Sequence, residues 1–466
     1  MTAYLEADLD TIDGLDALGV RLAGDLARLG DPEWDVARRA WHLAVDQRPE
    51  AVVHAATVDD VVLTLGAARE LGLRVAPQGT GHNAAPLGPL DRTILLKTSV
   101  MRGVIVDPVR RIARVEAGAL WMDVVPRAFE HGLTALAGSA PDVGVVGYTL
   151  GGGLSWHGRS LGLAANHVTA IELVTADGTF RRVDADHEPD LFWALRGGGG
   201  SFGVVTALEF RLFEFTSVQA GVLFFPLERA GEVLHAWREW VQTVPDEVTS
   251  VGRMLRFPPI PDLPPFLSGQ SFVVVEATIQ ASTEDAGELL APLRALGPAI
   301  DTFRPTPTSE LGQLHMDPPG PVPAVGDGML LAQLPPEAVE AALAVSGPAA
   351  DSPLISVEFR HLGGALAPDA ASGGAVAGLD AEFAMFAVGM TPTPEAQRTV
   401  RAAVDAVQTR LAPWSTGHVY LNFAERSKAG TALFGADTYR RLQRVKAAYD
   451  PTDVIRANHP VRPAAD

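Results

Sequence analysis

The chain has 466 residues, of which 37 are Lys or Arg and 56 are Asp or Glu, so its formal net charge is −19 with neutral histidine. It contains no cysteine, which excludes a disulfide, an iron–sulfur cluster, a cysteine nucleophile and a cysteinyl bond to a cofactor. The acidic balance and the lack of a basic run argue against a nucleic-acid partner and against an anionic membrane surface. The length predicts two or three domains with a large core.

The first residues, MTAYLEADLDTIDGLDAL, are acidic where a secretory signal needs a basic start and an apolar stretch. No uncharged apolar run is long enough to span a membrane, so we expect a cytoplasmic protein. Residues 1–46 predict a helical segment, because leucines such as Leu15, Leu18, Leu22 and Leu26 recur among acidic positions.

A β-α-β unit is predicted next, followed by a loop at 78–83. Its strands are expected at 52–55 and 74–77, with a helix over 57–71 opened by a capping pair, Thr57 and Asp60. The elements that follow are strands and two helices separated by glycine-rich segments at 138–153 and 197–203. They are expected at 93–98, 103–106, 111–116, 120–131 (helix), 171–175 and 180–183 (hairpin), 189–196 (helix) and 204–213.

The composition changes after about residue 215. Proline clusters at 257–265 and 305–323 predict exposed connections, and alternating segments at 271–280, 355–362 and 382–389 predict an antiparallel sheet covered by helices. Residues 438–450 predict an amphipathic helix that ends at Asp450-Pro451. We therefore expect an α+β protein. Its four expected parts are residues 1–46, 47–215, 216–414 and 415–466.

Several common site motifs are missing. No G-x-x-x-x-G-K-[ST] string exists, and the glycines at 197–203 lie between a helix and a following strand, the reverse of a Rossmann turn. Residues 153–157, GLSWH, place His157 where a nucleophile elbow needs glycine, so a serine hydrolase centred on Ser155 is a distant alternative. The spacing of the histidines predicts no metal site.

Five motifs occur in a characteristic order. They are GTGHN at 79–83, GSAPDVGVVGYTLGGG at 138–153, LFWALRGGGGSFGVVT at 191–206, YLNF at 420–423 and FGADTYRRLQRVKAAYDP at 434–451. Together they resemble the FAD-linked oxidases of the vanillyl-alcohol oxidase superfamily, and within it the berberine-bridge-enzyme-like branch. The resemblance covers residues 47–215 and 415–460. It implies a two-part PCMH-type FAD-binding domain and a separate substrate domain with an antiparallel sheet.

The resemblance implies that His82 is bonded to the 8α carbon of the flavin, while backbone N–H groups of the same loop hold the pyrophosphate. The loop residues concerned are Gly79, Thr80, Gly81 and Asn83, and successive amides bind anions well. The alternative is that His82 only hydrogen-bonds backbone. Many relatives make a second flavin bond through a cysteine, but Ala140 stands at that position, so the flavin is expected to be singly attached.

Further flavin contacts are implied along the chain. Val143 matches the position that controls access of oxygen, where a small valine accompanies oxidase behaviour; its alternative role is ordinary packing. The other positions, each of which could also be a simple turn or packing residue, are Gly138, Ser139, Gly144, Gly147, Gly151, Gly152, Val204, Asn422 and Asn458.

The strand at 354–361 supplies candidate catalytic residues. Alternation places Ser356, Glu358 and Arg360 on one face. Glu358 is the candidate general base or substrate-orienting carboxylate, and Arg360 would keep it ionised; an exposed ion pair on an edge strand is the alternative. His361 is a weaker candidate on the other face.

Two aromatic positions complete the candidate site. Tyr148 is a further catalytic candidate near the flavin ring, although simple packing is the alternative. Phe423 stands where relatives often carry a second tyrosine of the YLNF motif, so no phenol acts at that position.

The resemblance implies an FAD-dependent oxidase that transfers hydride from a small organic substrate to flavin N5, with reoxidation by O2 to H2O2. An alcohol, a sugar, an amine or a natural-product intermediate would suit as substrate. Two alternatives are a flavin-dependent oxygenase or cyclase of natural-product biosynthesis, and a flavin-binding protein without turnover. The sequence leaves the oligomeric state open.

Overall fold

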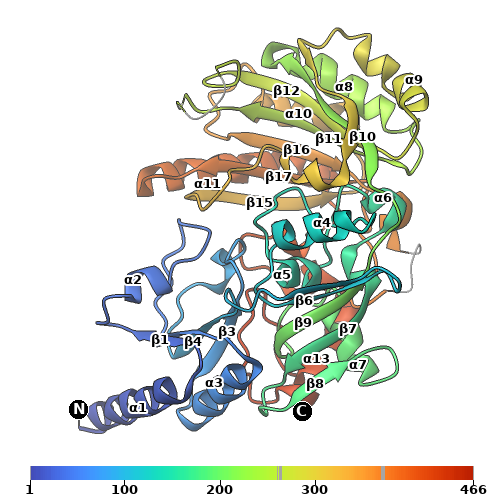
Figure 1. Cartoon of the computed structure of the whole chain (residues 1–466). Helices are drawn as coiled ribbons and strands as arrows, with labels where there is room; N and C mark the ends of the chain where they lie inside the picture. The colour runs from blue at the N-terminus through green and yellow to red at the C-terminus, as the bar shows by residue number, and fades with distance from the viewer. Residues whose placement is uncertain (1, 260, 262–264, 369–372, 465–466) are drawn as a thin grey trace.

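The computed structural model describes the chain except for residues 1, 260, 262–264, 369–372 and 465–466. Figure 1 shows one large sheet in the upper half of the molecule and two smaller sheets in the lower half. Helices and antiparallel strands are combined as expected for the α+β class.

The first small sheet contains the expected β-α-β unit. Parallel strands β2 (Ala51–His54), β4 (Thr93–Lys97) and β3 (Arg74–Gln78) lie side by side, and β1 (Asp25–Arg28) pairs antiparallel with β2. Helix α3 (Val58–Glu70) connects β2 to β3 and begins with a capping box formed by Thr57 and Asp60.

The prediction of a helical segment over 1–46 is wrong beyond its first part. Helix α1 (Thr2–Arg21) is followed by strand β1 and by the short helix α2 (Trp34–Ala37). Leu26 therefore lies on an edge strand opposite Val53, because pairing with β2 overrides the leucine spacing.

The second small sheet has the order β5 (Val104–Asp107), β6 (Ile112–Glu116), β9 (Val204–Arg211), β7 (Val168–Val174) and β8 (Phe180–Val183), all antiparallel. The predicted hairpin is β7–β8. Four helices belong to this part of the molecule: α4 (Trp121–Glu130), α5 (Val145–Leu150), α6 (Gly158–Leu161) and α7 (Pro189–Leu195).

The large sheet is antiparallel throughout, as predicted. Its order is β13 (Ile300–Asp301), β10 (Ser217–Pro226), β12 (Ser271–Ile279), β11 (Val248–Arg256), β16 (Ser356–His361), β17 (Phe383–Met390) and β15 (Ala324–Leu331), and β14 (Arg304–Pro307) also pairs with β10. Its outer face packs on four helices to form a large apolar core: α8 (Ala230–Trp240), α9 (Thr283–Arg294), α10 (Pro336–Ser346) and α11 (Pro394–Leu411). The other face is turned towards the smaller sheets.

The proline-rich segment at 305–323 is only partly an exposed connection. It begins within strand β14 and continues as a 3₁₀ helix over Thr308–Gln313, and Thr306, Thr308 and His315 are buried. Proline is tolerated here because β14 is an edge strand. Part of the other cluster, residues 260 and 262–264 of 257–265, lies outside the described residues.

The C-terminal segment returns to the smaller sheets. Helices α12 (Gly430–Phe434) and α13 (Ala436–Tyr449) pack on the core of the five-stranded sheet through Phe434, Leu442 and Val445. Ile455 then forms a parallel bridge with Val75 of β3. Ile455 thereby lies alongside strand β3 at the edge of the first sheet.

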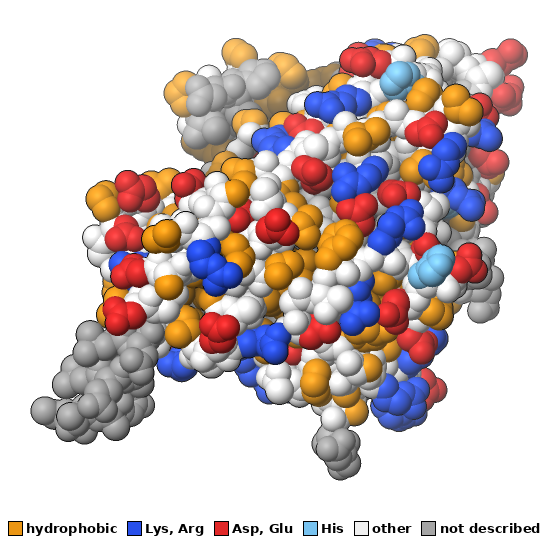
Figure 2. All heavy atoms as spheres, turned by 60° about the horizontal axis from the view of Figure 1, so that its bottom comes forward, with side chains coloured by type: hydrophobic (Ala, Val, Ile, Leu, Met, Phe, Trp, Pro, Cys, Tyr) orange, Lys and Arg blue, Asp and Glu red, His pale blue; other side chains and the backbone are white. Residues whose placement is uncertain are grey.

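Acidic and basic side chains are interspersed over the face shown in Figure 2, with no large region of one sign. Among the helices of the described residues, none is long and apolar enough to cross a membrane.

Candidate active site

The loop after β3 has backbone N–H groups that are free to bind an anion. Gly81 has φ +85°, and a Cβ there would lie 2.8 Å from the Cβ of Ala40, so both conformation and space require glycine. The carbonyls of Thr80 and Gly81 accept hydrogen bonds from the backbone of Trp41 and His42. Within the described part of the chain, the N–H groups of Thr80 and Gly81 have no acceptor of their own. These free donors are what a diphosphate needs.

His82 lies in a preformed aromatic and acidic environment. Its ring stacks on Trp41, with centroids 3.8 Å apart and planes at 21°. Its Nε2 atom lies 3.4 Å from Asp142 Oδ1 and has no hydrogen-bond partner among the described residues. Asp142 Oδ2 accepts a hydrogen bond from Trp41 Nε1 (2.6 Å). Burial would raise the pKa of Asp142, but the interactions with His82 and Trp41 outweigh it and lower that pKa.

The C-terminal asparagines close on this loop. Asn458 Nδ2 donates to the carbonyl of Asn83 (3.2 Å), and Asn83 Nδ2 donates to the carbonyl of Leu421 (3.3 Å). Asn422 Nδ2 donates to the carbonyl of Tyr148 (2.9 Å). A Cβ on Gly151 would fall 1.9 Å from Asn422 Oδ1, so glycine at 151 lets the tail approach.

The other residues expected near the flavin line the same region. Gly144 faces Thr80, Gly147 borders open space, and Gly152 has φ +115°. Val143 is half-buried, and its carbonyl accepts from Trp121 N (3.1 Å). Val204 is fully buried on β9 opposite Val174.

A second group of polar residues lies on the inner face of the large sheet. On β16, Arg360 Nε donates to Glu358 Oε1 (2.7 Å). Glu358 Oε2 lies 2.9 Å from His315 Nε2, and His315 Nδ1 lies 2.5 Å from Glu276 Oε2 on β12. Arg253 on β11 lies 2.7 Å from Glu276 Oε1. We call these five residues the buried charge cluster.

Neighbouring opposite charges set the protonation states of Glu358 and His315. Burial would raise the pKa of Glu358, but the charges of Arg360 and His315 outweigh burial and hold it well below its usual range. Burial and Arg253 would lower the pKa of His315, but Glu276 and Glu358 outweigh them and raise it to about 9. Near pH 7, Glu358 is therefore an anion and His315 a cation.

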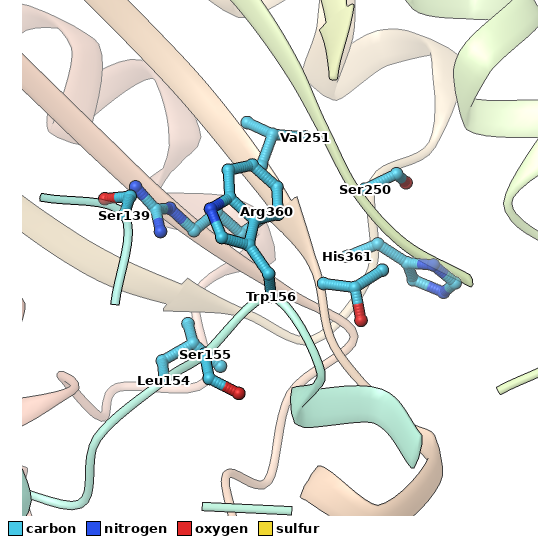
Figure 3. A pocket seen from close by; sticks show the side chains of 9 residues that line it. Ser139, Leu154, Ser155, Trp156, Ser250, Val251, Arg360 and His361 are labelled. Atoms are coloured by element: carbon cyan, nitrogen blue, oxygen red, sulfur yellow. The ribbon is translucent and has the colours of Figure 1, made fainter. Parts of the chain in front are cut away.

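A few contacts join the buried charge cluster and its surroundings to the segments that are expected to bind the flavin. Ser139 Oγ donates to Asp317 Oδ2 (3.1 Å), the Arg360 guanidinium lies 5.1 Å from the ring centroid of Phe423, and Trp156 packs edge-on against His315 with centroids 6.0 Å apart. Figure 3 shows Ser139, Trp156 and Arg360 around one small pocket. This places the cluster beside the segment 138–141.

Two of the catalytic candidates are not part of the buried charge cluster, although His361 lines the small pocket of Figure 3 together with Arg360. His361 points away from Arg360 (Figure 3) and its Nε2 lies 3.0 Å from Arg159 Nη1; burial lowers its pKa to about 3. Tyr148 is buried on the flavin side, and its hydroxyl donates to the carbonyl of Leu136 (3.1 Å). The structure thus brings Glu358 and Arg360 together without His361 or Tyr148.

Five residues of the site were not found from the sequence: Trp41, Asp142, Arg253, Glu276 and His315. Glu276 had a usable signal, since a carboxylate interrupts the apolar strand 271–279 on the face opposite Val273 and Val275. His315 follows the proline-rich segment and shows no periodicity.

Ser155 lacks the surroundings of a nucleophile. It is buried, and its Oγ accepts from the backbone N–H of His157 (3.1 Å). The ring of His157 instead lies 3.1 Å from Gln280 Nε2. The arrangement does not favour the serine hydrolase alternative.

Two family models match the chain. The model described as FAD binding domain matches residues 49–184, and the one described as Berberine and berberine like matches residues 419–462. The chain is 27% identical over 455 residues to an uncharacterized FAD-linked oxidoreductase, YgaK, of Bacillus subtilis, covering 95% of this chain and 98% of that protein. It is 32% identical over 198 residues to (R)-6-hydroxynicotine oxidase of Paenarthrobacter nicotinovorans, covering 42% and 43%.

Solved structures share the fold. BBE-like 1 of Physcomitrella patens superposes with a TM-score of 0.83 at 20% identity, covering 97% of this chain and all of that one (100%). Xylooligosaccharide oxidase of Myceliophthora thermophila gives a TM-score of 0.80 at 21% identity, covering 97% and 100%.

The residues present suit FAD. The free amides of the loop after β3, the unpartnered Nε2 of His82 and the small residues at 144–152 leave donors and space where the cofactor would lie. The two family models occur in the expected order, and the chain is an FAD-linked oxidoreductase with an FAD-binding domain at 49–184 and a berberine-like segment at 419–462.

Proposed function

We propose that the protein is an FAD-dependent oxidase of a small organic substrate, with O2 as the electron acceptor and H2O2 as the second product. FAD, when bound, supplies an N5 atom that accepts a hydride from a substrate C–H next to oxygen or nitrogen. In this proposal residues 47–215 and 415–466 hold the cofactor, and residues 216–414 hold the substrate. The observation that carries it is the buried charge cluster, which lies beside the segment 138–141 that contacts the flavin in the proposal.

Glu358 orients the substrate in this proposal. A carboxylate whose pKa is held far below its usual range is a weak proton acceptor, but it remains a fixed anion and hydrogen-bond acceptor. It can therefore bind a substrate hydroxyl or ammonium group and aim the neighbouring C–H. His315 keeps its proton near pH 7 and holds Glu358 in place.

Replacement of Glu358 by glutamine tests this role. The amide keeps the shape but loses the charge, so the rate constant of flavin reduction by a substrate should fall about 100-fold, the scale of a lost positioning contact. Rapid-mixing absorbance after screening alcohols, sugars and amines measures it. Glu310→Gln, at an exposed ion pair with Arg304, is the matched control and should keep the wild-type rate. Equal rates in both variants would remove Glu358 from the site, and no reduction of the wild type by any compound would favour a binding protein without turnover.

A single covalent bond from His82 to the flavin is the second part of the proposal. The stack on Trp41 and the nearby Asp142 carboxylate orient the imidazole, while Ala140 offers no sulfur for a second bond. Acid precipitation should give a yellow pellet from the wild type and a colourless pellet from His82→Ala. His187→Ala, at an exposed histidine, should behave like the wild type. A colourless pellet from a yellow wild-type protein would show that the flavin is bound without this bond.

A further inference from the structure

Glu276 is a carboxylate enclosed by the inner face of the large sheet. It lies on β12, opposite Val222 of β10 and Val251 of β11, and its exposed fraction is 0%. Its Oε2 atom accepts a hydrogen bond from Nδ1 of His315 (2.5 Å). Its Oε1 atom lies 2.7 Å from Arg253 Nη2, but among the described residues no donor is aligned for a hydrogen bond to Oε1. Burial of an ionised carboxylate is costly, and the one side chain that Glu276 hydrogen-bonds is the imidazole of His315.

Both ring nitrogens of His315 face a carboxylate. Nδ1 faces Glu276, and Nε2 lies 2.9 Å from Oε2 of Glu358. An ionised carboxylate can only accept hydrogen bonds, so each nitrogen must carry a proton, and only the imidazolium form has two N–H groups. His315 therefore joins the two carboxylates as a charged bridge from β12 to β16.

Two cations lie close to Nε2 of His315 and oppose its proton. Arg253 Nη1 is 3.0 Å and Arg360 Nη2 is 3.1 Å from this atom, so one anion and two cations surround Nε2 at nearly the same distance. Asp317, from the same segment as His315, adds a smaller attraction. Glu276, at the opposite nitrogen, is therefore the anion that turns the balance in favour of the proton.

We propose that Glu276 is a positioning residue of the site: its carboxylate keeps the imidazole of His315 doubly protonated, and the second N–H of that ring holds the carboxylate of Glu358. Because Glu276 is fully buried, it acts only through His315. The inference rests on the proposed function where it concerns flavin reduction, since there Glu358 orients the substrate. The protonation of His315 itself is measured without turnover.

Replacement of Glu276 by glutamine should release the proton of His315 near neutral pH. The amide keeps the shape of the side chain but loses its charge. His315 should titrate at about pH 9 in the wild type, and the midpoint should fall by about 2 pH units in Glu276→Gln, the usual effect of one neighbouring opposite charge. NMR of the FAD-loaded protein with 13C-labelled histidine measures the midpoint, and the signal of His315 is the one that is missing from His315→Gln.

Three further variants complete this titration. Glu276→Asp keeps the charge, so its midpoint should stay within about one pH unit of the wild type. Glu340→Gln removes an exposed carboxylate that lies 2.8 Å from His235, and it should leave the midpoint of His315 unchanged. If Glu276→Gln alone does not fold, its combination with Arg253→Met removes one charge of each sign, and the midpoint should then lie at least about one pH unit below that of Arg253→Met. Equal midpoints with and without Glu276, or a His315 that is neutral at pH 7 in the wild type, would overturn the proposal.

The pH dependence of flavin reduction distinguishes positioning from simple packing. Rapid mixing at pH 6 and pH 8 should use a substrate without a titratable group. The ratio of the reduction rate constants at pH 6 and pH 8 should be about 10-fold larger in Glu276→Gln than in the wild type, because a midpoint near pH 7 leaves about one tenth of His315 protonated at pH 8. Glu340→Gln should show the wild-type ratio. An equal loss of rate at both pH values would make Glu276 a structural residue only and would also overturn the proposal.

Failure of the proposed function would give a different result. If no compound reduces the flavin of the wild type, the oxidase proposal and the role of Glu276 in the reaction fail together. The midpoint of His315 would still show whether Glu276 keeps the proton on the imidazole.

Discussion

At the scale of single residues, the unusual feature is ionised groups buried together on one sheet face. Glu276 is 0%, Glu358 2% and Arg253 3% exposed, and such groups are tolerated inside proteins only when they neutralise one another. His315 bridges both carboxylates. Its protonation therefore couples the pH to the stability of the proposed substrate site.

Replacement of His315 by glutamine should change the pH dependence of stability. The pKa of His315 is raised from 6.5 to about 9 in the folded protein, so its stabilising contribution is complete below about pH 6.5 and is lost as the pH rises through about 9. The upward shift corresponds to about 3 kcal/mol at most. Urea unfolding at pH 6 and pH 9.5 should show a larger loss of unfolding free energy for the wild type than for His315→Gln. Equal losses would mean that His315 is neutral when folded.

Some residues of the site could be predicted because a local sequence pattern places them, whereas others are placed only by tertiary packing. Glu358 and Arg360 alternate with Val357 and Phe359, so the period of a strand alone places them on the inner face. His82 lies in a glycine-rich motif of fixed spacing. His315 and Asp142 reach the site through tertiary packing of irregular segments, and no local pattern encodes that.

At the scale of elements, helix α13 joins the tail to the glycine-rich segment 197–203. The fully buried Lys446 donates to the carbonyls of Ser201 (2.9 Å) and Ile455 (3.0 Å) and to Asp450 Oδ2 (2.5 Å). Asp450 also accepts from the backbone of Val454 and Ile455, both at 2.8 Å. One side chain thus fixes the end of the helix to two loops.

Lys446→Met should be strongly destabilising. The change leaves Asp450 as a buried charge without its cation, which costs about 3–5 kcal/mol, and the midpoint of urea unfolding should fall accordingly. Arg440→Met on the same helix removes an exposed ion pair with Asp437 and should cost about 1 kcal/mol or less. Similar losses in both variants would contradict a special role for Lys446.

Most elements were predictable because their periods are strong. The helix α13, the hairpin β7–β8 and the strand β16 lie within a few residues of the expected ranges. Strand β1 was missed because its four residues sit in a leucine-rich stretch and are extended only through pairing with β2.

At the scale of the whole molecule, the buried Arg159 connects the two halves. From helix α6 it donates to the carbonyl of Val248 on β11 (2.8 Å) and to Asp246 Oδ1 (2.9 Å), and it also bonds the carbonyl of Leu362 beyond β16. It therefore holds the large sheet against the segment that follows the glycines at 151–153.

Arg159→Gln should allow the half that contains the large sheet to unfold separately from the half that contains the two smaller sheets. The shorter side chain leaves buried carbonyl groups unsatisfied, at about 1–3 kcal/mol each, and the loss falls at the junction. Calorimetry should show an earlier, separate transition for the large-sheet half, while Arg182→Gln, at a partly exposed ion pair with Glu209, should melt like the wild type. A single unfolding transition of Arg159→Gln at the wild-type temperature would show that other contacts hold the two halves together.

The return of the tail to the first sheet also sets an order of events during synthesis. The loop that contains His82 is made early, but Leu421 and Asn458, which hydrogen-bond to its Asn83, follow 338 and 375 residues later in the chain. Domains fold as their residues become available. The nascent chain must therefore hold the His82 loop without these contacts until the residues up to Asn458 have been made.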